Sequence, residues 1–146
     1  MEAFFAIFLA SGLTLTLITQ GVLSLTPWYA PHYMIPIAGM IFAGSMNSVS
    51  LAAERFHSEL QNKTYIPARN IAFQAAMIPV INSLLAVGLV SLPGMMTGQI
   101  LSGISPFIAA RYQIMVIAMI FGASGLSAAL YLSLIKSYYS RHHYEL

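Results

Sequence analysis

Residues 3–53 read AFFAIFLASGLTLTLITQGVLSLTPWYAPHYMIPIAGMIFAGSMNSVSLAA and contain no Asp, Glu, Lys or Arg. Residues 70–110 and 112–135 are also free of formal charge. The 146-residue chain is 58% hydrophobic and 7% charged, whereas a soluble domain carries charge on about a quarter of its residues. Each uncharged stretch is at least as long as the roughly 20 residues with which a helix crosses a bilayer core. The sequence therefore predicts an integral membrane protein.

Prolines, glycines and the few charges divide the chain into four predicted membrane-spanning helices. Two prolines, Pro27 and Pro31, end the first helix because a proline inside a helix removes a backbone hydrogen bond. We expect an all-α, polytopic transmembrane helix bundle that forms a single domain over residues 1–146. The predicted spans are residues 3–25, 33–53, 71–92 and 112–135, with a polar connector at residues 54–70.

The distribution of Lys and Arg predicts the orientation of the bundle. The connector holds Arg55, Lys63 and Arg69, and two more basic residues lie beyond the fourth span, whereas the loop before that span holds only Arg111. Because basic residues favour the cytoplasmic side, both termini and the connector are predicted to be cytoplasmic. The net charge of +2 is small and scattered, so no nucleic-acid partner is expected.

Small residues recur four positions apart in the predicted spans. Helix backbones approach closely at such positions because lipid provides no hydrophobic drive for helix association. The pattern fits plain packing, or the sliding surfaces of a moving transporter. The pairs are Gly39 and Ala43, Gly94 and Gly98, Ala118 and Gly122, and Ser124 and Ala128.

Two asparagines lie deep inside predicted spans. At ~1.5 Å per residue, Asn47 lies ~10 Å and Asn82 ~18 Å from the cytoplasmic edge of its span. A carboxamide at such depth needs a hydrogen-bond partner, so each is either a link between helices or part of the lining of a polar pathway. The neighbouring Ser48, Ser50 and Ser83 are compatible with both interpretations.

The segment after the third span suits a broken or re-entrant element. Irregular backbone at membrane depth is tolerated only where protein or a water-filled cavity surrounds it, so the segment is either a structural cap or a functional element. Thioethers suit soft metal ions, although methionines in apolar runs also serve as core packing. If the element is functional, the residues expected on the translocation path or in contact with cargo are Pro93, Gly94, Met95, Met96, Thr97 and Gln99.

Enzymatic constellations are absent from the sequence. The chain has no Asp and no Cys, and Glu2, Glu54, Glu59 and Glu145 all lie outside the spans, so no buried carboxylate pair, proton relay or thiolate is available. No GxxxxGK[ST] loop is present for binding ATP. We therefore expect that the chain is not an enzyme, that it binds no cofactor, and that energy for any uphill transport comes from another polypeptide or an ion. No metal ligand set is assigned.

Several runs together resemble one family, the FetB/YbbM-type ABC transporter permeases, described as iron exporters with a plant branch linked to aluminium tolerance. The resemblance covers almost the whole chain and corresponds to the C-terminal part of the family. The runs are residues 35–40 (IPIAGM), 46–51 (MNSVSL), 75–79 (AAMIP), 87–99 (VGLVSLPGMMTGQ), 104–106 (ISP) and 111–116 (RYQIMV).

The resemblance implies a permease subunit, or its C-terminal half, in a bacterial inner membrane. It would form a homodimer in the lipid bilayer and export a transition-metal ion, with iron as the expected cargo. ATP would be used by a separate ABC-type ATPase subunit. Arg55, His57, Lys63 and Arg69 are expected to face that ATPase or the lipid headgroups.

The chain departs from the family pattern in two ways. Family members carry further spans before the position of Ala3, and their longer connector holds a Leu-Gly-Ala-Ser/Thr-Pro run that looks like a coupling helix for the ATPase. Here residues 59–69 lead almost directly into the third span. The alternative function is therefore a degenerate or split membrane protein that does not transport, or an assembly partner. A channel-like or ion-coupled small transporter is a further alternative.

Overall fold

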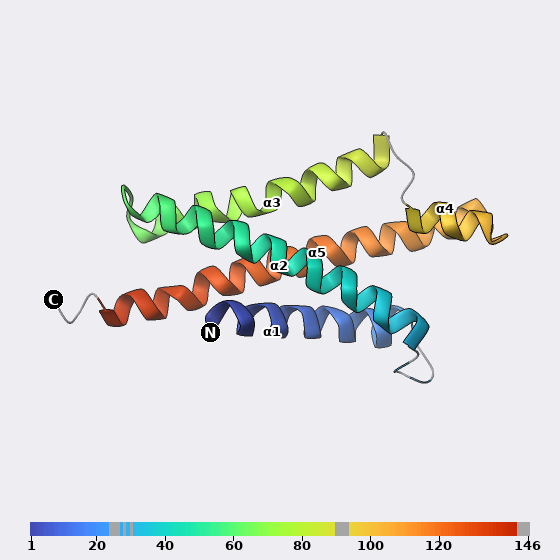
Figure 1. Ribbon diagram of the computed structural model, residues 1–146, viewed down its shortest axis with the longest axis horizontal. Coiled ribbons are helices and arrows are strands. Elements are labelled where there is room, and N and C mark those ends of the chain that lie inside the picture. The colour runs from blue at the N-terminus through green and yellow to red at the C-terminus, as the bar shows by residue number, and fades with distance from the viewer. Residues whose placement is uncertain (24–26, 28, 30, 90–93, 143–146) are drawn as a thin grey trace.

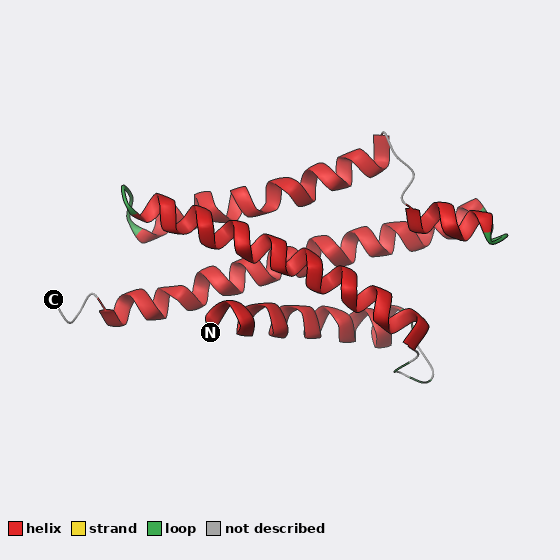
Figure 2. Ribbon diagram, viewed as in Figure 1, coloured by secondary structure: helices red, strands yellow, loops and turns green. Residues whose placement is uncertain are grey.

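The computed structural model describes residues 1–23, 27, 29, 31–89 and 94–142, and within this part of the chain all regular structure is helical (Figure 2). The all-α membrane bundle predicted from the sequence is confirmed. The elements are α1 (Glu2–Thr16), the π-helical segment η1 (Leu17–Val22), α2 (Pro31–Leu60), α3 (Tyr65–Leu89), α4 (Gly94–Leu101) and α5 (Pro106–His142).

Four long helices lie along the same axis and alternate in direction (Figure 1). Helices α2 and α5 are central, because α2 contacts α1, α3 and α5, and α5 contacts every other α-helix. The start of α1, the α2–α3 turn and the end of α5 lie toward one end of the bundle, which we call the polar end. Helix α4 and the start of α5 lie toward the opposite end.

Three of the described segments are long and apolar enough to cross a membrane: Glu2–Val22, Met34–Leu60 and Pro106–Lys136. They correspond to the predicted first, second and fourth spans. Helix α3 occupies the place of the predicted third span, residues 71–92, but that span ends outside the described residues and α3 is not among the three. It nevertheless packs against both α2 and α5 in the bundle.

Most of the predicted polar connector at residues 54–70 is helical in the structure. Helix α2 continues to Leu60 and α3 begins at Tyr65, which leaves only residues 61–64 between them. The extension is supported by Glu59, whose carboxylate pairs with Arg55 at 2.8 Å and also with Lys63. Such pairs at a spacing of four residues stabilise a helical turn. The polar sequence therefore prolongs the helix instead of ending it.

The first predicted span, residues 3–25, is not a regular helix throughout. The backbone changes to a π-helix at Leu17, and the amide of Leu23 donates to the carbonyl of Ile18 at 2.9 Å. The hydroxyls of Thr16 and Thr19 donate to the carbonyls four residues earlier, each at 2.8 Å. These bonds satisfy the threonine side chains within their own helix, as an apolar surrounding requires.

The predicted broken element is a short helix joined to α5 by a tight turn, so the long helix begins at Pro106 and not at residue 112. The amide of Ile104 donates to the carbonyl of Gln99, and that of Gly103 to the carbonyl of Ile100, each at 3.0 Å. With Gly103 at φ +87°, this is a Schellman motif, in which a left-handed residue closes the end of a helix. Pro106 then stands at the first position of α5, where its missing N–H is not needed.

Replacing Gly103 with Ala should destabilise the α4–α5 turn by about 1 kcal/mol, because a Cβ is disfavoured at positive φ. Hydrogen exchange of residues 94–104 in detergent would measure the effect as faster opening. Gly98→Ala is the matched control, since Gly98 lies in α4 with nothing within 4 Å of an added Cβ. Equal protection of both variants would contradict the assignment of the turn.

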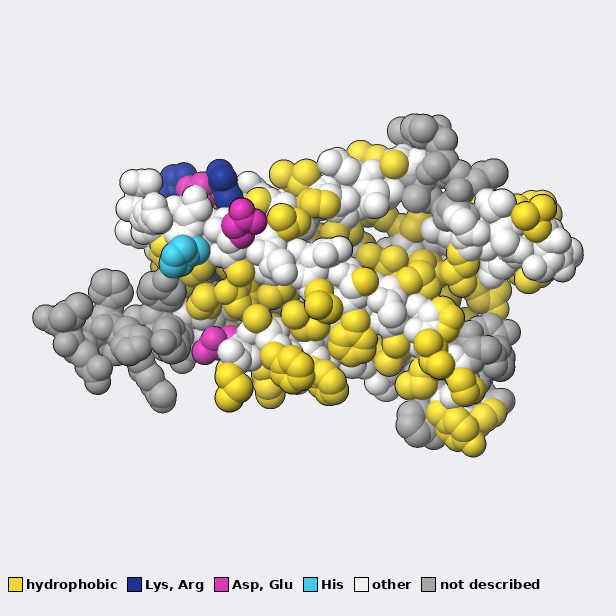
Figure 3. Space-filling model, viewed as in Figure 1, with side chains coloured by type: hydrophobic (Ala, Val, Ile, Leu, Met, Phe, Trp, Pro, Cys, Tyr) yellow, Lys and Arg dark blue, Asp and Glu magenta, His cyan; other side chains and the backbone are white. Residues whose placement is uncertain are grey.

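Helix α1 buries small side chains and exposes large apolar ones. Ala6, Ala10 and Ser11 are buried, whereas Phe4 and Phe8 are exposed. Figure 3 shows apolar side chains over much of the visible surface, while the charged side chains visible on this face gather toward the polar end. This arrangement suits lipid, which solvates large apolar side chains and leaves association to close packing of small ones.

Helices α2 and α5 pack closely against each other at Gly44. A Cβ added to Gly44 would lie 3.1 Å from Oγ of Ser124 and 3.2 Å from Cγ2 of Ile120. On the other side of α2, the hydroxyl of Ser11 in α1 donates to that of Ser45 at 3.0 Å. Two neighbouring residues of α2 therefore set its distance from two different helices.

Replacing Gly44 with Ala should destabilise the bundle by about 1–3 kcal/mol, because the added methyl group overpacks the α2–α5 contact. The measurement is the shift of the thermal unfolding midpoint in mild detergent. Gly39→Ala, in the same helix but with nothing within 4 Å of the added Cβ, should change the midpoint little. A larger effect at Gly39 would mean that the crossing lies elsewhere.

Candidate functional site

A cavity of about 260 Å³ lies between α2, α3 and α5. Its polar side chains are Asn47 and Ser48 from α2, Ser83 from α3 and Gln113 from α5. Pro79 also lines it, from inside α3. Since all three helices contribute, the cavity exists only when the bundle is assembled. The apolar and glycine positions that complete its wall are Gly44, Leu51, Ala76, Val80, Leu84, Ile117 and Ile120.

The polar lining of this cavity carries no formal charge. It consists of two carboxamides and two hydroxyls, each able both to donate and to accept hydrogen bonds. Within the described residues, no group of three or more His, Cys, Asp or Glu side chains is placed to hold a metal ion. The cavity can therefore bind a polar guest through neutral oxygen and nitrogen atoms.

Ser48 is the most buried polar member of the lining. Its side chain is 1% exposed, and its Oγ has no hydrogen-bond partner among the described residues. The hydroxyls of Ser124 and Ser127 in α5 are also buried and have no hydrogen-bond partner among the described residues. Buried hydroxyls are normally paired with protein or ordered water, so this part of the α2–α5 contact has unused capacity for hydrogen bonds.

The two predicted asparagines have different positions. Asn47 lines the cavity and Asn82 of α3 does not, although both side chains are exposed. Gln113 was not predicted as a site residue, because it stands two positions after Arg111 and was treated only as part of a motif. The sequence feature that could have identified Gln113 is a carboxamide near the start of a long uncharged stretch.

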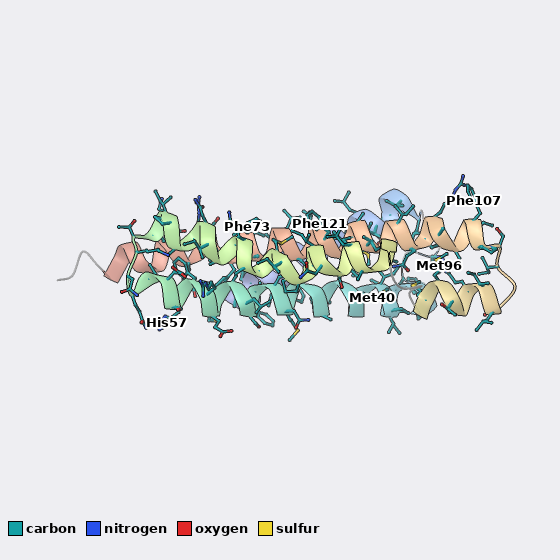
Figure 4. All side chains as sticks on the ribbon, turned by 90° about the horizontal axis from the view of Figure 1, so that it is seen from above. Met40, His57, Phe73, Met96, Phe107 and Phe121 are labelled. Atoms are coloured by element: carbon teal, nitrogen blue, oxygen red, sulfur yellow. The ribbon has the colours of Figure 1, made fainter. Side chains whose placement is uncertain are left out.

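The residues of the predicted broken element lie apart from this cavity. Gly94, Met95, Met96, Thr97 and Gln99 belong to α4, which supplies none of the residues that line it, and Pro93 lies outside the described residues. Figure 4 places Met96 and Phe107 toward one end of the molecule and His57 toward the other. The Oε1 atom of Gln99 is buried without a partner in the described structure. A cargo contact at α4 stays a prediction.

The four predicted ATPase-facing or headgroup residues lie near the α2–α3 turn. Arg55 and Lys63 both pair with Glu59, and His57 is exposed on α2. Arg69 donates to Oδ1 of Asn70 at 3.3 Å. It also lines a groove of about 390 Å³ between α3 and α5, together with Asn70, Phe73, Gln74, Ala129, Leu132 and Ser133.

Tyr65 connects α3 to α2 and α5 at the polar end. Its hydroxyl donates to the carbonyl of Leu132 in α5, and its ring meets Phe56 of α2 edge to face at 5.6 Å between centroids. Burial raises the pKa of the Tyr65 phenol above its ordinary value, so the hydroxyl stays a donor at neutral pH. The start of α3 is thereby fixed to both central helices.

Comparison with known proteins identifies the family. The model of the uncharacterised protein family UPF0014 matches residues 1–69 and 61–139. The chain belongs to the UPF0014 family. No solved structure matches it.

Curated UPF0014 relatives come from bacteria and plants. The UPF0014 membrane protein slr1647 of Synechocystis is 39% identical over 132 residues, which cover 79% of this chain and 51% of the relative. The probable iron export permease protein FetB of Escherichia coli is 39% identical over 160 residues, 97% of this chain and 61% of the relative. The protein ALUMINUM SENSITIVE 3 of Arabidopsis thaliana is 31% identical over 134 residues, 81% and 49% respectively. The chain thus spans about half to three fifths of the length of these relatives.

The alignment with the Escherichia coli relative extends over 160 residues, which exceeds the 146 residues of this chain. The relative therefore has internal positions that this UPF0014 chain lacks. The two matched segments of the family model meet at residues 61–69, which contain the α2–α3 turn. This is the place where the sequence led us to expect a shortened connector.

Proposed function

We propose that this chain is the membrane-spanning permease subunit, or the C-terminal half of one, of an ABC-type exporter of metal ions, with iron as the cargo. A separate ATPase subunit hydrolyses ATP, and two permease copies form the translocating unit in a bacterial inner membrane. The observation that carries the proposal is the 39% identity to the probable iron export permease FetB over 97% of this chain. The polar cavity around Asn47 supplies a place for cargo within the bundle.

The charge distribution supports a cytoplasmic position for the polar end. Arg55 lies near the end of α2, Lys63 in the α2–α3 turn, Arg69 near the start of α3 and Lys136 in the last part of α5, whereas Arg111 lies near the start of α5. Basic residues favour the cytoplasmic side. At the opposite end, the guanidinium of Arg111 lies 4.8 Å from the ring centroid of Phe107, a cation–π contact suited to the outer interface.

The α2–α3 turn is the proposed docking point for the ATPase. Arg55, His57, Lys63 and Arg69 surround this turn, and two of them, His57 and Arg69, are not engaged by Glu59. Only residues 61–64 separate the two helices, so the docking surface would consist of the helix ends beside the turn. The competing proposal, a degenerate or split protein that does not transport, draws on the same shortened turn.

Pull-down of the tagged chain, co-expressed with an ABC-type ATPase from the same organism, tests the proposal. We expect a stable complex in mild detergent, altered ATP hydrolysis, and metal efflux from proteoliposomes. Replacing Arg69 with Gln should weaken the complex about tenfold, because it removes a charge from the docking surface. Arg111→Gln is the matched control at the opposite end and should leave the affinity unchanged. No complex from a well-folded chain would favour the degenerate or split protein.

The proposed cargo contact of Met95 and Met96 has a separate test. Because α4 contributes nothing to the described cavity, replacing both methionines with Leu should leave efflux within about twofold, as expected for a swap that conserves volume and apolar character. Metal efflux per mole of reconstituted complex is the measurement. A large loss of efflux with an intact complex would instead assign the cargo contact to these thioethers.

A further inference from the structure

We infer that the cavity between α2, α3 and α5 binds its metal cation in hydrated form and recognises the coordinated water molecules, without replacing them. The inference rests on the proposed function in taking a metal cation as the cargo. It goes further in stating the chemical form of the cation and the residues that recognise it. Those residues are Asn47, Ser48, Ser83 and Gln113.

The donor set of the cavity is unsuited to a bare transition-metal ion. Such ions are held by imidazole, thiolate or carboxylate groups, and none of these groups is in the described lining. Removing the water shell of a divalent ion in a low-dielectric site is very costly when no charged ligand replaces it. Neutral carboxamide and hydroxyl oxygens are good acceptors for the polarised hydrogens of coordinated water. The chemistry therefore favours contact through the water shell.

The size of the cavity leads to the same conclusion. Six water molecules occupy ~180 Å³ at their share of the liquid volume, and the cavity offers about 260 Å³. A hydrated ion fits this space, whereas a bare ion would have to lie ~2 Å from each of its ligands. The polar side chains come from three different helices around the space. They surround a guest larger than a single ion.

Ser48 provides an independent indication of a polar guest. Its side chain is 1% exposed, lines the cavity, and has an unpartnered hydroxyl in the described structure. A buried hydroxyl of this kind is normally satisfied by protein or by ordered water. The Oγ atom is closed off in this structure, so water carried by the ion reaches it only if the α2–α5 contact shifts locally.

Recognition through water would make the cavity respond to the charge and size of the hydrated ion, and little to the softness of the metal. Cobalt(III) hexaammine is the diagnostic probe, because its six ammine ligands resemble coordinated water in size and hydrogen bonding but do not exchange. The experiment is titration calorimetry of the purified chain in phosphatidylcholine nanodiscs, with Mn²⁺ as the divalent probe. We expect the hexaammine to bind and to displace Mn²⁺.

Variants assign the binding to this cavity. Asn47→Leu and Gln113→Leu should each weaken hexaammine binding about tenfold, as for the loss of a hydrogen bond to a charged guest. Ser50→Ala and Gln74→Leu, outside the lining, are matched controls and should bind like the unchanged chain. Asn47→Asp should bind more tightly, because it adds a negative acceptor. This gain of affinity cannot be produced by misfolding.

Binding of Mn²⁺ that the hexaammine does not displace would overturn the inference, because it would require direct ligation by the protein. Absence of binding by both probes would overturn it too, as would equal losses in the control variants. The assay contains no ATPase and measures no transport. If the chain binds the hydrated cation but forms no complex with the ATPase, only the proposed function is refuted. If the complex exports metal but the chain binds neither probe in these titrations, only this inference is refuted.

Discussion

The close contact of α2 with α5 at Gly44 is the constraint on which the bundle depends. Lipid is as apolar as the side chains it meets, so helices associate through close packing and hydrogen bonds. Gly44 places α2 against Ser124, and the adjacent Ser45 bonds to Ser11 of α1. Helix α3 joins through alanines at every fourth position, Ala68, Ala72 and Ala76, all fully buried. Gly44 also lines the cavity, so the crossing of the helices defines one of its walls.

The sequence was sufficient to predict the helices because their signal is carried by composition. An uncharged stretch of more than 20 residues has few alternatives to a membrane helix, and most of the described residues in these stretches are helical. Helix α2 extends past the predicted span of residues 33–53 to Leu60, where Glu59 lies at the right spacing to pair with Arg55 and Lys63. The π-helical segment at residues 17–22 has no comparable signal, since the residues that form it are ordinary for a membrane helix.

The site was less predictable than the fold, because the side chains that face the cavity depend on how each helix is rotated about its axis. Asn47 and Asn82 looked equivalent by depth, and both are exposed, yet Asn47 lines the cavity and Asn82 does not. Helix α3 is weakly amphipathic, so its sequence does not distinguish an inward from an outward carboxamide. Gln113 was not predicted as a site residue because it was considered only within the motif at residues 111–116. Only the packing of three helices brings Gln113, Asn47 and Ser83 around one space.

The continuity of α2 bears on how the proposed ATPase would act on this cavity. No acidic group is among the described residues of the cavity lining. Under the proposed function, we therefore expect the ATPase to act on the cavity mechanically. Helix α2 is continuous from Asn47 to Leu60, a distance of ~20 Å at ~1.5 Å per residue. A displacement applied to the α2–α3 turn would travel along this one rigid element to the cavity wall and, at Gly44, to its contact with α5.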